Sequence, residues 1–597
     1  MEKKELNIQG GEFLVKETDA EEIFIPEEFD EEQQMIGETC QDFLETEVFP
    51  NLDRIDNKEE GVMESVLKNA GELGLLGISI PEEYEGFGQS FLTSMLAAEV
   101  LGAGYSFSVA YSAHTGIGTL PIVYYGNEEQ KQKYLPKLAT GEYTAAFALT
   151  EPGAGSDANA GKTKAVPSED GKHYILNGQK MWITNGGFAD IQVVFAKVEN
   201  DRILSAFIVE KDTEGVVINP EEPKMGIKGS STVQIFYNDV KVPAENMLGK
   251  RGEGFRIALN ILHMGRIKLG GNVIGAAKLA VSNSVNYANE RKQFGKLISE
   301  FGTIKHKLGE QAVKTFATES AVYRISKNID EAIEKYTAEG AEYGKASMDG
   351  FIQYEAEDAM MKVFSSESLD YIVDESVQIM GGMGFSSEMP ADRAYRDSRI
   401  NRIFEGTNEI NRLWNTDTIF KRGRKGKIDV FGKAEEVIND LDNLLGQEFQ
   451  SKGYFEDKAF FVQNFKKVAL ILLQAAKDKF DRKLGMEQEI SCFLSDIITH
   501  AYVAESVMLR VKKLESNGLK QDDMLKLYKD MLDVYMHEAS SVIQKNALDA
   551  LYSIEEENLS DKYKKAIMKF TDLPAFNIKE ARRRIADKII EENKYCF

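Results

Sequence analysis

The spacing of apolar residues changes twice along the chain. Over residues 31–141, apolar positions recur three and four apart, as in the run 63–77, and this period predicts amphipathic helices. Over residues 143–248, the pattern becomes short runs rich in β-branched and aromatic residues with turn residues between them, which is typical of a β-barrel or sandwich. Helical periodicity returns at Gly254 and continues to the end of the chain.

These changes predict an α+β protein of several domains, because 597 residues exceed what one hydrophobic core can hold. We expect an acidic N-terminal arm, an N-terminal helical domain, a middle β-barrel or sandwich domain, a helical domain and an additional C-terminal helical domain. The predicted boundaries are 1–30, 31–142, 143–253, 254–420 and 421–597.

Composition and charge exclude several classes of function. The net charge of −25 argues against a general nucleic-acid binder, because neutralising phosphates requires clustered Lys and Arg. The three cysteines are scattered and the six histidines show no ligand spacing, so we expect neither disulfides nor a metal site. The first residues are acidic, and we see no run of about 18 apolar residues; we therefore expect no targeting segment, no membrane-spanning helix and a cytoplasmic location.

A loop of small residues, Glu151–Asp157, follows the first strand-like run. Its glycines and the Ser156 hydroxyl can present hydrogen-bond donors to an anion such as a pyrophosphate. A solvent-facing turn is the alternative interpretation. The spacing of its glycines matches neither the dinucleotide-binding fingerprint nor a P-loop.

Trp182 and Thr184 stand two residues apart in a strand-like run. They should therefore share one face of the sheet, where an indole plane and a hydroxyl can meet the same flat ligand. A half-buried strand aromatic would also account for Trp182.

Three features of the second helical region have both a structural and a functional interpretation. Glu405 follows a stripe of arginines that is more typical of a salt-bridged helix face than of a ligand clamp, and alone it would be a solvated carboxylate. The run 291–295 ends a helical segment, and its Arg and Gln suit either a helix C-terminus or a phosphate and a nucleoside. The glycines after Gln378 permit close approach of a ligand to the backbone.

Seven long motifs occur together in a fixed order. They are TEPGAGSD, NGQKMWITNG, KMGIKGSSTVQIFYNDVKVP, GRIKLGGNVIGAA, RKQFGK, QIMGGMGF and YRDSRINRIFEGTNEI. On these motifs the chain resembles the acyl-CoA dehydrogenase family, specifically its long, very-long-chain members with an extra C-terminal helical domain. The resemblance covers about residues 30–420, and the remainder matches in length and helical character.

The resemblance implies a fold and a cofactor. The family fold is an N-terminal helical domain, a middle β domain and a four-helix bundle, with FAD between the last two and its adenine end at a neighbouring subunit. The residues implied to bind FAD are Leu149, Thr150, Ser156, Trp182, Thr184, Arg291, Gln293, Phe294, Gln378, Gly382, Thr407 and Glu409, with those from Arg291 to Gly382 reaching the FAD of the partner subunit.

The resemblance also implies a reaction, the α,β-dehydrogenation of acyl-CoA in fatty acid β-oxidation. Glu405 would take the α-proton, the β-hydrogen would leave as hydride to flavin N5, and electrons would pass to an electron-transfer flavoprotein. Ser156, Arg266 and Gly406 would contact the substrate. Some branches carry the base just before the residue matching Arg266, where this chain has Gly265, so Glu405 stands alone as the candidate.

Details of the substrate and the assembly follow less directly. Small residues in the stretch 109–116 favour long acyl chains, and His114 within it is expected to be a structural hydrogen-bonder. Three residues before Arg266, where medium-chain members of the family carry an acidic residue, this chain has His263. The segment 464–480 is either a core helix or a basic-flanked helix on a membrane surface, and the domain that contains it favours a homodimer over a tetramer. An acyl-CoA oxidase and an assembly or scaffold protein that keeps the fold are the alternative functions.

Overall fold

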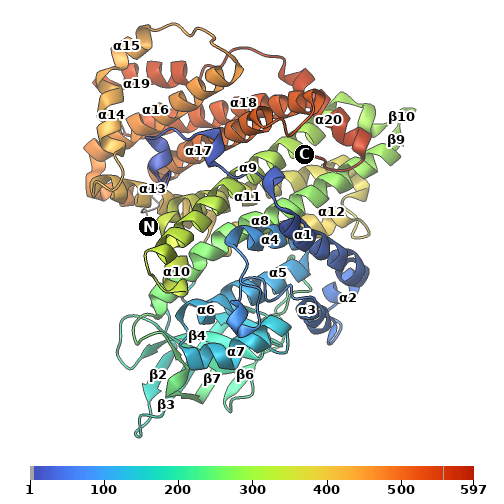
Figure 1. Cartoon of the computed structure of the whole chain (residues 1–597), viewed down its shortest axis with the longest axis vertical. Coiled ribbons are helices and arrows are strands. Elements are labelled where there is room, and N and C mark those ends of the chain that lie inside the picture. The colour runs from blue at the N-terminus through green and yellow to red at the C-terminus, as the bar shows by residue number, and fades with distance from the viewer. Residues whose placement is uncertain (1–5, 555–556) are drawn as a thin grey trace.

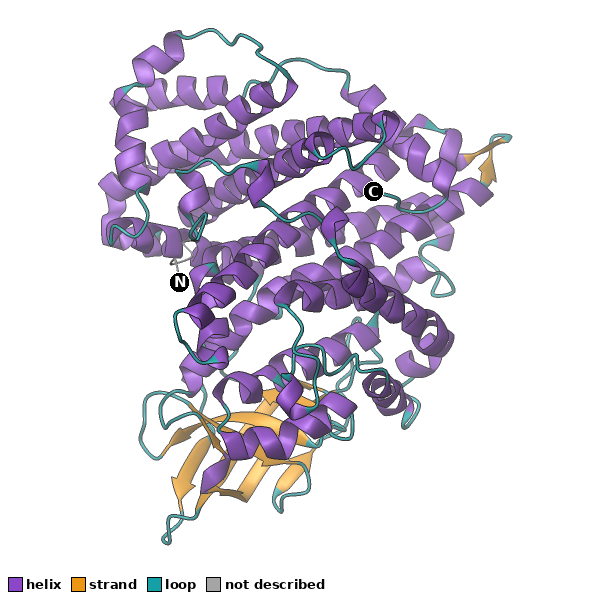
Figure 2. Cartoon of the chain, viewed as in Figure 1, coloured by secondary structure: helices purple, strands orange, loops and turns teal. Residues whose placement is uncertain are grey.

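The computed structural model describes residues 6–554 and 557–597, with the backbone alone for 557–560. Helices form most of the chain, and the strands of the main sheet gather at one end of the molecule (Figures 1 and 2). The predicted order of a helical region, a β region and a longer helical region is therefore confirmed.

The N-terminal helical region is built of short helices around α4. Ser90 starts α4 by accepting the Thr93 N–H, and α4 is buried because it lies against α1 and the long helix α8. The helices are α1 (Glu31–Phe43), α2 (Leu52–Asp56), α3 (Val62–Glu72), α4 (Phe91–Gly102), α5 (Ser106–Ser112), α6 (Leu120–Tyr125) and α7 (Glu128–Thr140). A π-helical stretch, Ala113–Gly118, follows α5.

The middle region is a mixed sheet that folds over on itself. Its strands are β1 (Ala145–Ala148), β2 (Lys164–Pro167), β3 (His173–Thr184), β4 (Ile191–Val198), β5 (Ser205–Glu210), β6 (Val216–Ile218), β7 (Thr232–Pro243) and β8 (Met247–Leu248), in the spatial order β6-β7-β3-β2-β4-β5-β8 with β1 beside β4. Because β2 pairs antiparallel with β3 and parallel with β4, it joins the two halves. Val194 and Phe207 of one half pack with Leu176 and Ile235 of the other, which makes a sandwich-like core.

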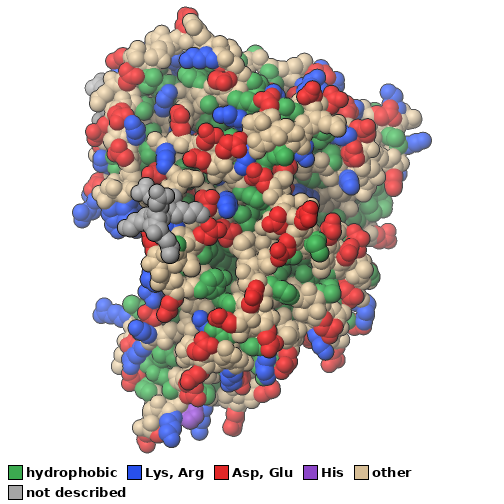
Figure 3. Space-filling model, in the orientation of Figure 1, with side chains coloured by type: hydrophobic (Ala, Val, Ile, Leu, Met, Phe, Trp, Pro, Cys, Tyr) green, Lys and Arg blue, Asp and Glu red, His purple; other side chains and the backbone are tan. Residues whose placement is uncertain are grey.

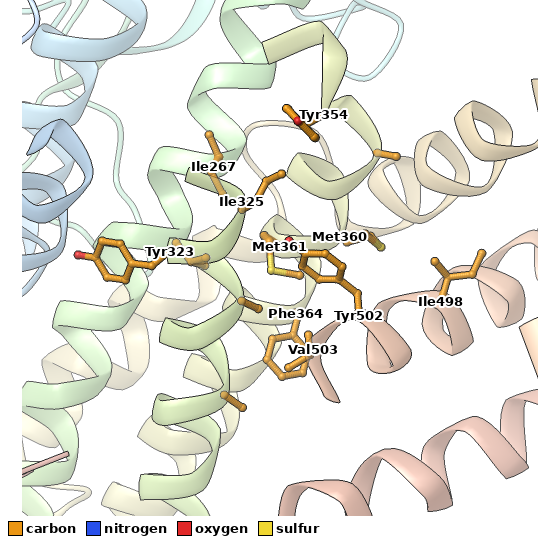
Figure 4. Packing of buried hydrophobic residues seen from close by; sticks show 14 of the residues in the cluster. Ile267, Tyr323, Ile325, Tyr354, Met360, Met361, Phe364, Ile498, Tyr502 and Val503 are labelled. Carbon is orange, nitrogen blue, oxygen red and sulfur yellow. The ribbon is translucent and has the colours of Figure 1, made fainter. Parts of the chain in front are cut away.

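The helical region that follows the sheet is organised around three long helices, α8, α9 and α11. Its elements are α8 (Gly254–Glu290), the hairpin β9 (Lys292–Gln293) and β10 (Lys296–Leu297), α9 (Gly302–Ala338), α10 (Tyr343–Gln353), α11 (Glu355–Met380), α12 (Pro390–Ser398) and α13 (Asn408–Arg424). A Cβ on Gly275 of α8 would stand 1.8 Å from the Glu99 carbonyl oxygen of α4, so only glycine allows these two backbones to approach so closely. Figure 4 shows Met361 of α11 beside Tyr502 of the C-terminal region, whereas Tyr323 of α9 points away from Tyr502.

The C-terminal region packs directly on the bundle. It comprises α14 (Val430–Asn439), α15 (Leu441–Gly446), α16 (Tyr454–Phe480), α17 (Gln488–Ser516), α18 (Asp522–Ile554), α19 (Glu557–Phe570) and α20 (Ile578–Glu592). By length and composition alone, two segments here are apolar enough to cross a membrane, Tyr454–Met486 and Gln488–Ser516, whereas the sequence pattern had predicted none. Their most apolar windows are 72% and 78% buried inside the protein, which is typical of core helices.

Buried charges tie α16 and α17 to the bundle. Lys466 of α16 forms an ion pair with Glu505 of α17, and Glu505 also pairs with Arg324 of α9 at 3.0 Å. All three side chains are at most 3% exposed. The segment 464–480 therefore packs as a core helix, because its apolar residues Val468 and Leu472 are fully buried and one of its four lysines, Lys466, faces inward.

The segment before α1 lies along the helices. The residues predicted as an acidic arm include buried Phe13 and Ile25, and Glu27 pairs with Arg510 at 2.9 Å. Residues 1–5 of that arm lie outside the described residues. On the face shown in Figure 3, acidic and basic side chains are interspersed, as expected of a surface with excess acid but no broad basic area.

Candidate functional site

An elongated cavity lies between α8 and the segment from α4 to the π-helical stretch. The α8 side contributes one face of that helix, at three- and four-residue spacing, from Met264 to Ala280. The opposite wall is built of small residues, including Gly102, Ala103, Ser108, Ser112, Ala113 and Gly116. Thr184 and Glu405 line the same cavity, so the structure brings these two predicted site residues together.

Glu405 sits in a turn whose backbone is held in an uncommon conformation. Glu405 and Gly406 both have positive φ, 57° and 88°. A non-glycine residue there is unusual and frequently marks a functional site. The carbonyls of the turn are fixed by side chains: Arg266 donates to that of Glu405 at 3.2 Å, and Lys362 and Asn411 donate to that of Gly406 at 2.7 and 2.8 Å. Thr407 then caps α13 by accepting the Ile410 N–H.

Gly265 makes the space that the Glu405 carboxylate occupies. A Cβ at position 265 would lie 2.6 Å from Glu405 Oε2 and 3.0 Å from Cδ. Glu405 Oε2 is buried and has no hydrogen-bond partner among the described residues. An oxygen in this state is free to accept a proton from a ligand in the cavity.

The electrostatic surroundings suit proton transfer near neutral pH. Burial raises the pKa of the Glu405 carboxyl to about 7, although the Arg266 and Lys362 cations pull it downward. Burial likewise lowers the pKa of Lys362 to about 7. A carboxyl with a pKa near the working pH is a suitable general base.

Trp182 and Thr184 project from an irregular end of β3. The register of β3 against β7 shifts between Lys180 and Ile183, and Trp182 has a φ of 60°, so the strand is bulged at this point. Ile183 is buried, whereas the Trp182 side chain is 51% exposed. Because the bulge interrupts the regular alternation of the strand, the sharing of one face by Trp182 and Thr184 stays a prediction.

A buried ion pair holds the small-residue loop in place. Lys180, which is fully buried, donates to Glu151 at 2.8 Å and to the Leu149 carbonyl at 3.0 Å. Leu149 itself is buried and Thr150 is partly buried, whereas Ser156 is exposed. Open space surrounds Gly153 and Gly155, where an added Cβ would meet nothing within 4 Å, so a ligand could approach the backbone there.

The remaining predicted cofactor residues are not beside this cavity. The hairpin β9–β10, which bears Gln293 and Phe294, lies at the opposite end of the bundle from the sheet (Figure 1). Arg291, Gln293, Gln378 and Gly382 are exposed, and Phe294 is 94% exposed. Glu409 is exposed on α13 near the Glu405 turn. The structure of one chain therefore divides the predicted set between two distant surfaces.

Other sequence interpretations can be compared with the contacts. The arginine stripe is a salt-bridged face, because Arg393 pairs with Asp56 and Arg396 with Asp392. His114 has the structural role expected of it: its Nε2 lies 3.0 Å from the Leu138 carbonyl and its Nδ1 accepts the Ala145 N–H.

Several residues of the site had no signal in the sequence. Lys362 and Asn411 support the Glu405 turn from α11 and α13, and neither stands out by type or spacing. Trp414 lies 5.5 Å from the Arg266 guanidinium and 5.5 Å from the His263 ring, and these three residues form the layer behind the turn. Only contacts between distant segments identify them.

Comparisons with known proteins agree along the whole chain. Four family models match: acyl-CoA dehydrogenase N-terminal domain at 30–142, middle domain at 146–240, and two C-terminal domain models at 252–418 and 464–570. A probable acyl-CoA dehydrogenase of Bacillus subtilis is 44% identical over 597 residues, covering all of both chains. The very long-chain specific acyl-CoA dehydrogenase of Rattus norvegicus is 40% identical over 466 residues, 76% of this chain and 64% of the rat protein.

Solved structures give the same result. An acyl-CoA dehydrogenase complexed with FAD from Bacillus anthracis has a TM-score of 0.95 and 43% identity, covering 99% of this chain and 100% of that one. Butyryl-CoA dehydrogenase from Megasphaera elsdenii has a TM-score of 0.59 and 34% identity over 66% of this chain and 98% of its own. The shorter enzyme thus lacks a counterpart of about one third of this chain. From its four matching domain models and its full-length relatives, we conclude that the chain belongs to the acyl-CoA dehydrogenase family.

Proposed function

We propose that the protein is an FAD-dependent dehydrogenase of long-chain acyl-CoA thioesters that acts in fatty acid β-oxidation. The observation that carries this proposal is the unpartnered Glu405 carboxylate at one end of an elongated cavity. Its raised pKa, about 7, suits removal of the weakly acidic proton next to a thioester carbonyl.

The residues present fit FAD as the cofactor. Thr184 lines the cavity and the exposed Trp182 lies two residues before it, so the two would offer a hydroxyl and an aromatic face to a flat ring system. Gly153 and Gly155 leave the backbone of the loop open to a pyrophosphate, near the exposed Ser156. When bound, FAD would supply the acceptor for the hydrogen that leaves the β-carbon as hydride.

The chain's own residues would position the thioester and move the proton. Glu405 Oε2 takes the α-proton, and the fixed turn holds that oxygen at one place. With the carbonyls of Glu405 and Gly406 bonded to Arg266 and Lys362, the carboxylate and the backbone N–H of Glu405 are among the groups of the turn that remain for the ligand. We propose that this N–H donates to the thioester oxygen, where negative charge develops as the proton leaves.

The cavity length supports long acyl chains. From Gly265, beside the carboxylate, to Ala280 the lining positions of α8 span fifteen residues, roughly 22 Å at 1.5 Å per residue. An extended alkyl chain gains roughly 1.3 Å per carbon from its bond geometry, so this wall can accompany about 17 carbons. The small residues opposite, such as Ala113 and Gly116, leave room for the chain.

Assembly, acceptor and location complete the proposal. The exposed residues Arg291, Gln293, Phe294, Gln378 and Gly382 would reach the FAD of a partner subunit, in a homodimer. An electron-transfer flavoprotein would take the electrons. We propose a cytoplasmic location.

The test is anaerobic bleaching of bound flavin by acyl-CoAs of different length. We expect purified protein to be yellow, to bleach with acyl chains of about 14 to 18 carbons, and to lose bleaching in the Glu405→Gln variant. Turnover-matched peroxide production in air would identify an oxidase instead. A colourless protein that cannot take up FAD would indicate a scaffold that has kept only the fold.

A further inference from the structure

One lysine in the acyl cavity has no partner. Five lysines are buried among the described residues, and four of them, Lys180, Lys362, Lys466 and Lys513, donate to a carboxylate or a carbonyl. Lys268 of α8 forms no hydrogen bond or ion pair with any described residue. Lys268 is only 9% exposed, and an ammonium largely withdrawn from water without a partner is costly, so such a residue in a cavity is a candidate for binding a ligand.

Lys268 stands among polar groups in the cavity wall. Asn272, one turn further along α8, donates to Ser112 Oγ at 2.9 Å, while its own Oδ1 is buried and unpartnered. Ser108, 6% exposed, lines the same wall. The side chains of Lys268, Asn272, Ser112 and Ser108, which we call the polar subsite, interrupt an otherwise largely apolar surface.

The position of the polar subsite along the cavity sets the length of chain that would reach it. Lys268 lies three residues beyond Gly265, and Asn272 lies seven, which corresponds to roughly 4.5 and 10 Å along the helix axis. At roughly 1.3 Å per carbon, these distances fall about three to eight carbons beyond the carbon that faces Glu405. Since the carbon that faces Glu405 is the second of the chain, a carboxyl group at the end of an acyl chain of about five to ten carbons would lie there.

We propose that Lys268 makes the cavity selective for acyl-CoAs whose chain is about five to ten carbons long and ends in a carboxylate. This inference rests on the proposed function and names a substrate class for it. The carboxylate supplies the acceptor that Lys268 lacks, and the hydroxyl of Ser112 lies in the same wall. A plain long chain still fits, because it can lie against the methylene groups of the lysine side chain.

The first test is equilibrium binding of unreactive thioethers to the FAD-loaded protein, measured by calorimetry. The ligands are decyl-CoA and its counterpart with a terminal carboxylate, neither of which has a thioester carbonyl. The variants are Lys268→Met, which keeps the side-chain length, and Leu279→Met, a control further along the same cavity. Because hydrogen bonds to charged groups contribute about 1.5–3 kcal/mol, we expect Lys268→Met to weaken binding of the carboxylated ligand by roughly 10- to 100-fold. Binding of decyl-CoA should be unchanged or tighter, and Leu279→Met should change the ratio of the two affinities less than about twofold.

The second test uses only the wild-type protein and therefore does not depend on a variant folding. Burial lowers the pKa of Lys268 to about 8, so a bound carboxylate should raise it and cause proton uptake at pH 8.5–9. The other titratable groups lining the cavity are Glu405, Asp397 and Tyr105, and decyl-CoA controls for their response. Calorimetry in two buffers of different ionisation enthalpy measures the uptake.

Two results would overturn the inference. One is that Lys268→Met changes the ratio of the affinities for the carboxylated and the plain ligand by less than twofold from the wild-type ratio. The other is that both ligands cause equal proton uptake by the wild-type protein. Its failure is distinct from that of the proposed function. If plain acyl-CoAs bleach the flavin while the ratio does not move, only the assignment of Lys268 is wrong. If no acyl-CoA binds or bleaches, the proposed function itself fails.

Discussion

Gly265 packs directly against the Glu405 carboxylate, and this contact predicts the effect of one added methyl group. In Gly265→Ala, the new Cβ would be 2.6 Å from Oε2, whereas ordinary contact begins at 3.4 Å. The oxygen must therefore retreat by about 0.8 Å. Misplacement of a reacting group by about 1 Å costs on the order of 10²-fold in rate. We expect flavin bleaching by a long-chain acyl-CoA to slow by roughly 30- to 100-fold.

The substitution should not act by unfolding the protein. Alanine is favoured over glycine by about 1 kcal/mol in a helix interior, and this gain partly offsets the local displacement. We expect FAD content and melting temperature to stay near those of the wild type. Gly270→Ala is the matched control, because it lies on the same helix and its Cβ would be 3.0 Å from Val322 Cγ2. That variant should bleach within about threefold of the wild-type rate.

The assay is anaerobic stopped-flow absorbance of the flavin with saturating substrate, followed by the rate as a function of pH. If Gly265→Ala bleaches as fast as the wild type with full FAD content, the carboxylate does not act from the place where the structure puts it. A slow rate accompanied by loss of FAD would point to a disturbed cofactor site and would equally contradict the steric argument.

Four further predictions follow from the charges and surfaces. Since the pKa of Glu405 is raised from 4.5 to about 7, the wild-type bleaching rate should fall as pH drops through 7; a flat rate between pH 6 and 8 would remove Glu405 as the base. Because its pKa is raised on folding, the ionised Glu405 carboxylate destabilises the folded protein above pH 7, and this cost disappears below pH 4.5. We therefore expect Glu405→Gln to be more stable than the wild type by on the order of 1–3 kcal/mol at pH 8 and by less at pH 5, as measured by thermal melting. Lys466→Met removes one of the partners of the buried Glu505 and should lower the free energy of unfolding, measured in urea, by about 3 kcal/mol. The control Lys545→Met removes a surface ion pair and should change that free energy by less than about 0.5 kcal/mol; equal effects of the two variants would contradict the burial argument. Phe294→Asp should lower both FAD content and the mass measured by light scattering, and a yellow dimer would contradict the assignment of this residue to a subunit contact.

The order of the domains could be predicted because it depends on local period. Helical spacing before Gly141 and after Gly254, and short β-branched runs between them, follow from which faces must be buried. The sheet topology could not be predicted in the same way. The role of β2, which joins two halves by pairing with β3 and β4, depends on residues distant in sequence.

The candidate base could be predicted, but its setting could not. Glu405 was identified through the motif around it, and its position at the cavity agrees with that assignment. From the sequence, Gly265 indicates only that no base stands at that position. The structure shows in addition that the absence of a side chain at Gly265 makes room for the Glu405 carboxylate. Lys362 is 43 residues from Glu405 and Lys268 is 137 residues away, and no local pattern reports such proximity.

The burial of charge in α16 and α17 also decides between the interpretations of the C-terminal region. A helix that lies on a membrane must present one apolar face to lipid and its basic residues to the headgroups. In α16, Lys466 is instead 1% exposed and paired with Glu505, while Val468 and Leu472 are fully buried against neighbouring helices. Moving this face to a membrane would separate the ion pair and leave Arg324 and Glu505 without their full set of partners, at a cost of several kcal/mol. The apolar stretch of α16 therefore serves the packing of this region on the bundle.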